Sequence, residues 1–526
     1  MLKRWWRTIR KRRLALSLAG MSGVLYFVGF CGFDQYYLAW FCLVPVLWAL
    51  DDATLSGREA LLVAWTFGLV THLGGYTWII GMLRDFGYLP WPLALLGYFV
   101  LCLGQSTLLA AWGWGVHRLV HRHGAPLWLA APVVMVLAEW LWPALFPSYL
   151  SSSQYEQILF IQTLDLWGPL GLSFIVTLAS STLYATLAWR WHAHAMPRLA
   201  WPVLVLLIAG DLTYGWARRT DVLDTAAHAD RFIRVGVVQT NMGIYEKSEN
   251  PREGLERHRD QSLEVERQGA QLIVWPESGY YYGIPDGTSN VAREVLGAIT
   301  TPLIFGGLRV RRTAADREIY NTAFLADAEG NLLGTYDKTY LLAFGEYLPL
   351  GEWLPWLYDL SPHSSRFSRG THTRPLVLDG VRYGMLICYE DVLPGFTREV
   401  MEHQPHVLVN ITNDAWFGKT REPRIHLALS TFRAVEHRRF LVRATNTGIS
   451  AFVDPTGSIV AETPVFARAN LVHDVAALEG ATLYAQAGDL VPVLPCLAGV
   501  ISWLRQPLRK LGQWLRRGRA RPKRAR

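Results

Sequence analysis

The chain alternates long apolar runs with a polar middle section. A helix needs about 20 mainly apolar residues to cross a bilayer, and such runs fill the first 215 residues and recur near residue 490. The second run is short, and the sixth contains Gly168, Pro169 and Gly171. The predicted spans are residues 14–33, 36–50, 60–83, 90–116, 126–146, 164–188, 199–215 and 487–504. The pattern predicts a polytopic α-helical membrane protein with about eight spans.

The same pattern divides the chain into four parts. We predict an N-terminal transmembrane domain of about seven helices over residues 1–215 and a water-soluble insert over residues 216–486. A final span at 487–504 and a basic tail at 505–526 follow. The first apolar run could instead be a signal peptide, but no small-x-small cleavage site follows it and six similar runs come after it.

The insert alternates strand and helix patterns. Two tight turns, at residues 328–331 and 379–380, and a third within 451–460 indicate hairpins. The predicted strands are residues 231–240, 271–275, 302–310 and 406–411, and the predicted helices are 251–268, 290–299 and 423–443. Hairpins mixed with helices indicate an α/β sandwich in which helices cover the sheets.

Charge adds the orientation of the spans. Basic residues precede the first span and occupy alternate loops, whereas the connections at 32–35 and 147–157 contain no Lys or Arg. The basic positions are Arg4, Arg7, Arg10, Lys11, Arg12, Arg13, Arg118, Arg122, Arg190 and Arg198. Because cytoplasmic loops carry the excess of Lys and Arg, this alternation places both termini in the cytoplasm and the insert outside. In a bacterium the insert would then be periplasmic, on the outer side of the inner membrane.

Composition supports a membrane location. The chain is 51% hydrophobic and has 23 Trp, many of them near the ends of apolar runs, as is typical of membrane interfaces. The net charge of +8 lies largely in the two end segments. Nucleic acid binding is one interpretation of such ends, but retention of a cytoplasmic segment beside a span is the commoner one, and we expect no nucleic acid partner.

One of the five cysteines stands apart. Cys388 follows a predicted buried strand, whereas the other four lie within apolar runs, where they behave as small hydrophobic residues. An insert with one cysteine cannot form an internal disulfide. Because the chain has no CxxC pair, we expect no structural metal and, more generally, no metal or other cofactor.

Two further charged residues end strands of the insert. Glu277 follows the apolar run 272–275, and Lys338 follows the run 334–337. A carboxylate can take the proton of a thiol, and an ammonium can stabilise the thiolate and then an oxyanion, as can the backbone N–H of Tyr389. Together with Cys388 they could carry out acyl transfer through a thioester. The alternative is two surface charges and a core thiol, and spacing alone does not exclude it.

Short motifs around these residues show a family resemblance. They are Trp-Pro-Glu ending at Glu277, Tyr-Asp-Lys ending at Lys338 and Cys-Tyr-Glu beginning at Cys388. Further motifs occupy residues 344–349, 413–418 and 443–450. The insert resembles the nitrilase superfamily, whose catalytic residues are Glu, Lys and Cys in this order. With its spans, nearly the whole chain resembles bacterial apolipoprotein N-acyltransferases.

The resemblance implies a nitrilase-like αββα sandwich and an acyltransferase. Cys388 would attack an acyl ester of a phospholipid, and the α-amine of a diacylglyceryl-cysteine at an apolipoprotein N-terminus would then take the acyl group. Glu346 would be a second carboxylate beside Lys338, while Tyr389 and Glu390 would support the cysteine. The chain departs from the family after the lysine, where Tyr340 and Ala343 replace the usual His and Pro.

Aromatic segments of the insert are candidate lids. Residues 280–282 follow Glu277 directly, and residues 348–360 contain further large apolar side chains. The candidate contacts to lipid are Tyr280, Tyr281, Tyr282, Trp353 and Trp356. Ordinary interior packing is the alternative for each segment. A lid would matter because hydrolysis of a thioester competes with its aminolysis.

Several remaining residues receive ordinary structural roles. Asp391 is predicted to cap a helix, and His426 and His437 are predicted to be capping or surface residues. Glu139, inside a predicted span, is left without an assigned role. We expect a monomer. Two other functions stay open: a membrane-tethered nitrilase-type amidase, and a transporter or receptor with a ligand-binding outer domain, although a transport path calls for more charged residues in the spans.

Overall fold

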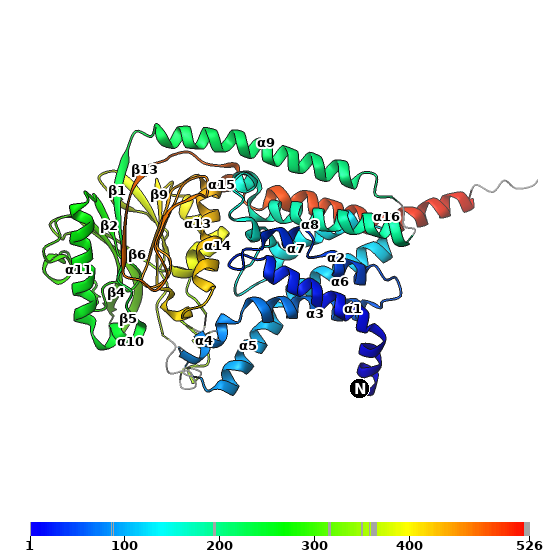
Figure 1. The fold of residues 1–526 in the computed structure, drawn as a ribbon, viewed down its shortest axis with the longest axis horizontal. Coiled ribbons are helices and arrows are strands. Elements are labelled where there is room, and N and C mark those ends of the chain that lie inside the picture. Colours follow the sequence, from blue (N-terminus) through cyan, green and yellow to red (C-terminus); the bar gives the residue numbers. More distant parts are fainter. Residues whose placement is uncertain are drawn as a thin grey trace, which may run out of the picture.

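The computed structural model describes residues 2–85, 87, 89–192, 196–313, 317–343, 345–348, 351–356, 358 and 365–519. It has two parts, a bundle of helices and a two-sheet domain, joined end to end (Figure 1). The helices of the bundle are α1 (Leu2–Gly29), α2 (Val44–Leu50), α3 (Gly57–Gly75), α4 (Trp78–Asp85), α5 (Trp91–Gln105), α6 (Thr107–His123), α7 (Leu127–Leu141), α8 (Leu164–His192), α9 (Ala200–Ala227) and α16 (Leu490–Arg519).

Three stretches of helix are long and apolar enough to cross a membrane among the described residues: Trp91–His123, Phe160–Trp191 and Ala200–Ala227. Tyr36–Leu50, Leu127–Leu141 and Leu490–Arg505 are apolar but shorter. The total of eight spans therefore stays a prediction. The outer faces of α5 and α9 carry exposed apolar side chains, including Leu96 and Leu206, as lipid-facing helices do.

Several predicted runs are broken in the structure. Residues 36–50 form the short 3₁₀-helix Tyr36–Trp40 and then α2, and residues 60–83 are split into α3 and α4 at Tyr76. Residues 90–116 fall within the continuous helical stretch Trp91–His123, in which α5 and α6 meet at Ser106; the Ser106 N–H donates to the Cys102 carbonyl at 3.0 Å, and its hydroxyl donates to the same oxygen. Helix α9 instead continues to Ala227, beyond the predicted end of the membrane domain at residue 215.

The second part is a sandwich of two sheets. The seven-stranded sheet has the order β13-β1-β2-β4-β5-β6, with β3 paired to β4, and the six-stranded sheet has the order β12-β11-β10-β9-β8-β7. The strands of the first sheet are β1 (Phe232–Gln239), β2 (Leu272–Val274), β3 (Gly283–Pro285), β4 (Leu303–Arg312), β5 (Arg317–Ala326), β6 (Leu332–Asp337) and β13 (Ala469–Ala476). Those of the second are β7 (Leu376–Leu378), β8 (Val381–Ile387), β9 (Val407–Thr412), β10 (Leu441–Thr445), β11 (Ala451–Val453) and β12 (Ile459–Glu462).

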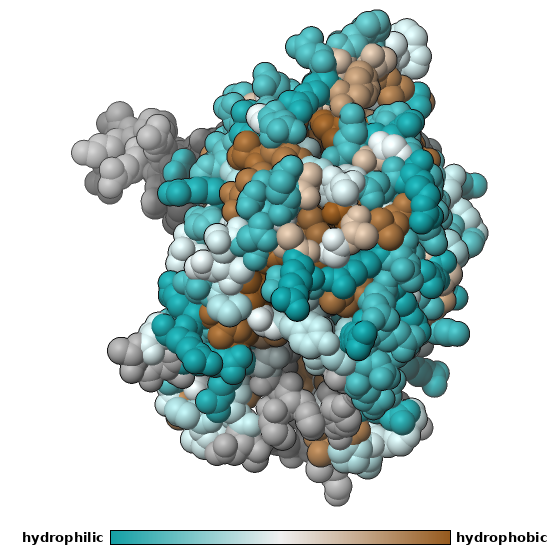
Figure 2. Space-filling view, turned by 90° about the vertical axis from the view of Figure 1, so that its left-hand side faces the viewer, coloured by the Kyte–Doolittle hydropathy of each residue, from teal (hydrophilic) through white to brown (hydrophobic). Residues whose placement is uncertain are grey.

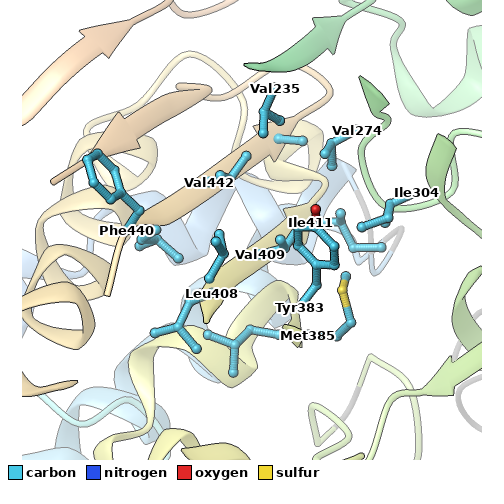
Figure 3. Packing of buried hydrophobic residues seen from close by; sticks show 14 of the residues in the cluster. Val235, Val274, Ile304, Tyr383, Met385, Leu408, Val409, Ile411, Phe440 and Val442 are labelled. Carbon is cyan, nitrogen blue, oxygen red and sulfur yellow. The ribbon is translucent and has the colours of Figure 1, made fainter. Parts of the chain in front are cut away.

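Helices cover both outer faces of the sandwich. Helices α10 (Ile244–Glu249) and α11 (Pro251–Arg267) lie on the first sheet, and α13 (Pro394–Met401) and α14 (Glu422–His437) lie on the second, beside the bundle (Figure 1). The short helix α15 (Leu483–Ala487) leads into α16. Between the sheets, Val235, Val274 and Ile304 face Met385 and Val442 across one apolar core (Figure 3). The predicted αββα sandwich is thus found.

Two secondary-structure predictions in the insert were wrong. The helix predicted at 423–443 ends at His437, and its last residues belong to strand β10. The helix predicted at 290–299 is a single turn, Ala292–Leu296. The strand predictions at 231–240, 271–275, 302–310 and 406–411 correspond to β1, β2, β4 and β9.

Helix α14 connects the two parts of the molecule. Its Ala428, Phe432 and Val435 belong to the same apolar cluster as the bundle helices. At its end Arg438 donates to the carbonyl oxygen of Gln162, in the 3₁₀-helix Phe160–Thr163 before α8, at 2.7 Å, and to Asp165 Oδ2, in the first turn of α8, at 2.9 Å. The opposite end of the sandwich, farthest from the bundle, presents a mainly hydrophilic surface (Figure 2). The sandwich is therefore docked on the helices through one face only.

Candidate active site

The three predicted residues meet where strands of both sheets end. Glu277 follows β2, Lys338 follows β6, and Cys388 follows β8. Cys388 adopts a left-handed backbone conformation with φ +53°, which turns the chain sharply at the thiol. Gly306 of β4 lies so close to Glu277 that a Cβ there would come within 2.7 Å of the Glu277 Cα, so only glycine admits this close approach of the two backbones.

Lys338 is the centre of a buried ionic cluster. Its ammonium lies 2.8 Å from Glu346 Oε2 and 3.8 Å from Glu277 Oε1, and its side chain is 1% exposed. The amide of Asn321, on β5, donates to both carboxylates at 2.7 Å and 3.0 Å and so fixes them relative to each other. Glu277 Oε2 has no hydrogen-bond partner among the described residues, which leaves it free to accept a proton.

Charge states follow from burial and these neighbours. Burial alone would lower the pKa of Lys338, but Glu346, Cys388 and Glu277 outweigh it and raise that pKa, so the lysine is a cation. Burial, and then the Glu277 charge, raise the pKa of the Cys388 thiol despite Lys338, so the resting thiol is protonated. Burial also raises the pKa of Glu277, against the opposing effect of Lys338. A carboxylate of raised basicity beside a neutral thiol suits proton transfer between them.

Glu390 holds the lysine loop and the cysteine turn together. Its Oε1 accepts from the backbone N–H groups of Thr339 and Tyr340 at 2.7 Å and 2.8 Å, and its Oε2 accepts from Ile387 N–H at 2.8 Å. The Tyr336 hydroxyl donates to the same oxygen. Burial raises the pKa of Glu390 to about 7. Glu390 therefore supports the cysteine as predicted, and it does so by binding backbone N–H groups on both the lysine side and the cysteine side of the site.

Tyr389 contacts the membrane domain. Its hydroxyl donates to the Leu145 carbonyl, and its ring lies edge-on to Phe146 at 6.0 Å and tilted against Tyr340 at 6.2 Å. The residue next to the thiol thus docks on the loop between α7 and α8. Tyr340 adds an aromatic contact on the other side of Tyr389.

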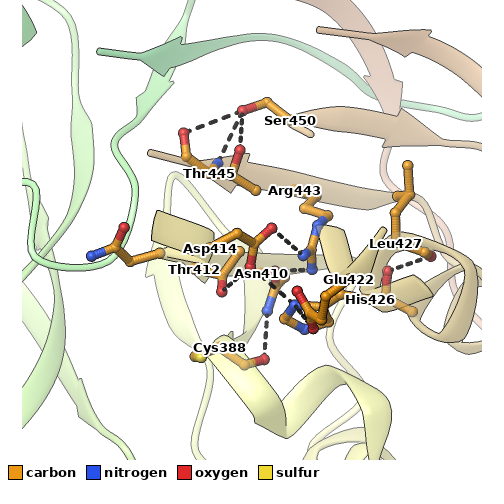
Figure 4. A network of polar contacts seen from close by, with 12 residues as sticks. Cys388, Asn410, Thr412, Asp414, Glu422, His426, Leu427, Arg443, Thr445 and Ser450 are labelled. Carbon is orange, nitrogen blue, oxygen red and sulfur yellow. Dashed lines mark hydrogen bonds and ion pairs between the residues drawn. The ribbon is translucent and has the colours of Figure 1, made fainter. Parts of the chain in front are cut away.

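Behind the thiol lies a buried polar network that sequence analysis missed (Figure 4). Asn410 of β9 donates to the Cys388 carbonyl at 3.2 Å, and Arg443 of β10 donates to Asn410 Oδ1 at 2.8 Å. Arg443 also pairs with Asp391 at 2.5 Å and with Asp414 at 3.3 Å. The network holds the turn at Cys388 from below. Asp414 lies in the motif at 413–418 and Arg443 in the motif at 443–450, so these two motifs were the features of the sequence that could have indicated the network.

Three minor predictions are corrected by this network. Asp391 is fully buried in the ion pair with Arg443, and α13 begins only after Leu393, so Asp391 is not its cap. His426 is buried between Asp391 (2.8 Å) and Asp414 (3.1 Å), and His437 is 1% exposed, so neither is a surface residue. Although burial and Arg443 oppose it, Asp391 and Asp414 raise the pKa of His426 to about 10. A protonated His426 and Arg443 therefore neutralise the two aspartates.

Replacing Arg443 with methionine is expected to destabilise the sandwich. Removing one partner of a buried ion pair leaves the other charge uncompensated, at a cost of about 3–5 kcal/mol. This corresponds to a fall in Tm on the order of 10 °C for a domain of this size. Thermal unfolding of the purified protein measures it, with the exposed pair of Arg252 and Glu256 as control: Arg252→Met should change Tm by about 1 °C at most. Equal, small shifts for both variants would contradict the structural role of Arg443.

A narrow apolar cavity connects the thiol to the bundle. Cys388 lines it together with Tyr389, Phe146 and side chains of three helices of the bundle, and its volume is about 70 Å³. The bundle residues are Tyr26, Phe27 and Phe30 of α1, Thr71, His72 and Gly75 of α3, and Trp78 of α4. The sulfur is thus reached from the helices, through apolar and aromatic side chains.

The predicted lid residues divide into two groups. Tyr280 is 7% exposed and packs edge-on to Phe305 at 6.2 Å, so it belongs to the interior. Tyr281, Tyr282, Trp353 and Trp356 are exposed at the surface of the sandwich. Trp353 is 80% exposed and Trp356 is 54% exposed, which are unusual values for tryptophan in a water-soluble domain. Leu357, in the same segment, lies outside the described residues.

Comparison with known proteins agrees with this geometry. Residues 234–482 match the family model for carbon-nitrogen hydrolases, and residues 22–182 match the model for the N-terminal domain of apolipoprotein N-acyltransferases. The sandwich with Glu277, Lys338 and Cys388 at its strand ends is therefore a nitrilase-type domain attached to a membrane domain.

Relatives of similar length narrow the assignment. The chain is 31% identical to an apolipoprotein N-acyltransferase of Bdellovibrio bacteriovorus, over 95% of this chain and 96% of the relative. It is 32% identical to one of Pseudomonas aeruginosa, over 92% and 94%. An amidase structure from Nesterenkonia sp. is similar at 23% identity and a TM-score of 0.34, covering 48% of this chain and 92% of that one. The chain belongs to the apolipoprotein N-acyltransferase family.

Proposed function

We propose that the protein transfers a fatty acyl chain from a membrane phospholipid to the N-terminal amine of diacylglyceryl-cysteine in apolipoproteins. Cys388 Sγ attacks the ester carbonyl and its proton passes to Glu277, while Lys338 stabilises the oxyanion. When the ester C–O bond breaks, Glu277 protonates the departing lysophospholipid, and an acyl-thioester remains. The α-amine then attacks the thioester carbon and Glu277 takes the amine proton. When the C–S bond breaks, Glu277 gives this proton to Sγ, which restores the thiol and the carboxylate.

The apolar cavity between Cys388 and the bundle is the observation that carries this proposal. A small amide needs no path to a sulfur through Phe27, Phe30 and Trp78, whereas an acyl chain entering from the bilayer does. At about 70 Å³ the cavity is far below the several hundred Å³ of usual ligand sites, so it must widen to admit a chain. Its apolar walls also keep water from the thioester.

The proposed orientation in the membrane follows the distribution of charge. We place the sandwich on the periplasmic side of the bacterial inner membrane, both termini in the cytoplasm, and eight spans between them, because basic residues occupy alternate loops. The protein acts as a monomer, since one chain brings Glu277, Lys338 and Cys388 together. This arrangement gives the thiol access to phospholipid and lipoprotein in the same leaflet.

Wild-type protein incubated with phospholipid alone tests the proposal. We expect an intact-mass increase of one acyl chain and one equivalent of lysophospholipid. No adduct, together with hydrolysis of a short soluble amide, would instead identify a tethered amidase. Neither adduct nor amide hydrolysis would favour a binding or transport function.

Replacing Trp356 with glutamate tests the lid. An exposed Trp that enters the lipid stabilises the contact of the lid with the membrane because its apolar ring is buried, whereas a carboxylate in the same place opposes that contact. We therefore expect adduct formation from phospholipid vesicles to fall about tenfold or more. The matched control is Phe232→Glu at the start of β1, an aromatic residue of the sandwich that is also exposed, at 46%, but does not line the cavity that contains Cys388. Unchanged adduct formation by Trp356→Glu would remove the lid role.

A further inference from the structure

A second cavity lies beside the thiol, and the proposed reaction does not use it. It has a volume of about 320 Å³ and lies between the end of α7, the loop that follows it, and the start of α13. Pro147 and Ser148 line both this cavity and the apolar one. Tyr340, which also lines it, lies tilted against Tyr389, the neighbour of Cys388, with ring centroids 6.2 Å apart. The second cavity therefore meets the cavity of the reacting sulfur at this loop.

One of the residues that line the second cavity is a buried acid. Glu139 of α7 is 8% exposed, and its Oε1 accepts from Leu150 N–H at 2.8 Å. The Ser173 hydroxyl also interacts with this carboxyl, but Oε2 has no hydrogen-bond partner among the described residues. An acid inside a membrane helix is costly unless something neutralises it, so it points to a functional partner.

The rest of the lining suits a cation. Five aromatic side chains surround the space, and the second acid of the lining, Glu399, is exposed at the rim. The aromatic residues are Trp140, Trp142, Tyr149, Tyr340 and Phe396. No Lys or Arg is among the described lining residues. Aromatic faces and carboxylates are the groups that bind ammonium ions.

We propose that this second cavity binds the ammonium group of a membrane substrate, with Glu139 as its counter-charge. The inference rests on the proposed function, which supplies two such groups. One is the amino head group of a donor phospholipid, and the other is the α-amine of the acceptor. Either would lie one loop away from Cys388, with its acyl chains toward the bundle helices.

The test separates donor and acceptor steps. Adduct formation on Cys388 is measured with vesicles of two phospholipids that have the same acyl chains, one with an ethanolamine and one with a glycerol head group. Transfer from the preformed thioester is then measured against the concentration of a diacylated lipopeptide. Glu139→Gln removes the charge and keeps the shape, and Glu402→Gln, on the exposed end of α13 outside the cavity, is the control.

The two sources of ammonium predict different losses. If the site binds the head group, Glu139→Gln should slow adduct formation from the ethanolamine lipid about tenfold and from the glycerol lipid less than about twofold. If it binds the acceptor, adduct formation should be unchanged and the KM for the lipopeptide should rise about tenfold at nearly constant kcat. Either result supports the inference.

Other outcomes overturn it. Two results would show that Glu139 only holds Leu150. In the first, Glu139→Gln forms the adduct and transfers the acyl group at rates within about twofold of wild type. In the second, it forms the adduct equally slowly with both lipids and its KM for the lipopeptide is unchanged. If Glu139→Gln does not fold, Glu399→Gln, a variant of the exposed acid in the cavity lining, is tested in its place. We expect it to show the same pattern of losses at a smaller size. No loss in either step would contradict the site. A wild type that forms no adduct would overturn the proposed function itself, and a wild-type adduct with unresponsive variants overturns this inference alone.

Discussion

Cys388→Ala is expected to abolish both the acyl adduct and transfer to lipopeptide, a loss of about five to six orders of magnitude in rate by analogy with removal of other catalytic nucleophiles. The fold should survive, because the turn at residue 388 is held through the backbone. Asn410 bonds the Cys388 carbonyl, and Glu390 bonds Ile387 N–H, and neither contact involves the sulfur. Adduct mass and single-turnover transfer measure the effect.

Cys102→Ala is the matched control for this prediction. Cys102 is equally buried, but in α5 and outside the lining of the apolar cavity. Its loss should leave adduct formation within about twofold of wild type. If the adduct persisted in Cys388→Ala and disappeared in Cys102→Ala, the nucleophile would be Cys102 of α5, and the proposed active site would be contradicted.

Lys338→Met is expected to slow thioester formation by about three orders of magnitude or more. Removal of one oxyanion donor costs about 10²–10³ in rate. The variant also loses the cation that favours the thiolate of Cys388 and the ionised form of Glu277. The protein should be less stable as well, because Glu346 loses a partner at 2.8 Å in a buried site.

A double variant separates the two effects of Lys338. Lys338→Met with Glu346→Gln removes both charges of the pair, so Tm should recover toward wild type while the acyl-transfer rate does not. Lys419→Met, a surface lysine near Phe466, should change neither quantity. Recovery of activity together with Tm would mean that Lys338 acts only in folding.

The location of the reacting groups could be predicted because each follows a strand pattern. Glu277 and Cys388 come directly after buried apolar strands, β2 and β8, whereas Lys338 follows the run 334–337, which belongs to the partly exposed strand β6. Spacing did not show that the three residues form one site; that expectation came from the resemblance of the motifs to the nitrilase superfamily, and the packing of the two sheets brings the strand ends together. The motif at 344–349 likewise indicated Glu346.

The network beneath the thiol could not be predicted, for a physical reason. Strand β10 is buried along its whole length, so it lacks the alternation that identifies a half-exposed strand, and its residues were read as the end of the helix before it. Arg443 and His426 also resemble surface residues until their partners are known. Asp391 and Asp414 are distant in sequence, and only the fold brings them to these side chains.

The bundle was harder to predict than the sandwich. Apolar runs predict that a segment is in contact with lipid or core, but not where a helix breaks. Nor do they predict contacts between helices: Gly68 of α3 lies so close to the junction of α5 and α6 that a Cβ there would come within 2.7 Å of the Ser106 carbonyl oxygen. The role of Glu139 also needed the fold, since the cavity it faces is closed on the other side by α13 and Tyr340.

A chase experiment tests the central claim most directly. The protein is loaded with phospholipid, the free lipid is removed, and a diacylated lipopeptide with a free N-terminal amine is added. The account predicts that the acyl mass is on the peptide containing Cys388, and that it disappears at the rate at which triacylated lipopeptide appears. An acyl group that stays on the protein while product forms, or product without any acylated Cys388, would contradict it.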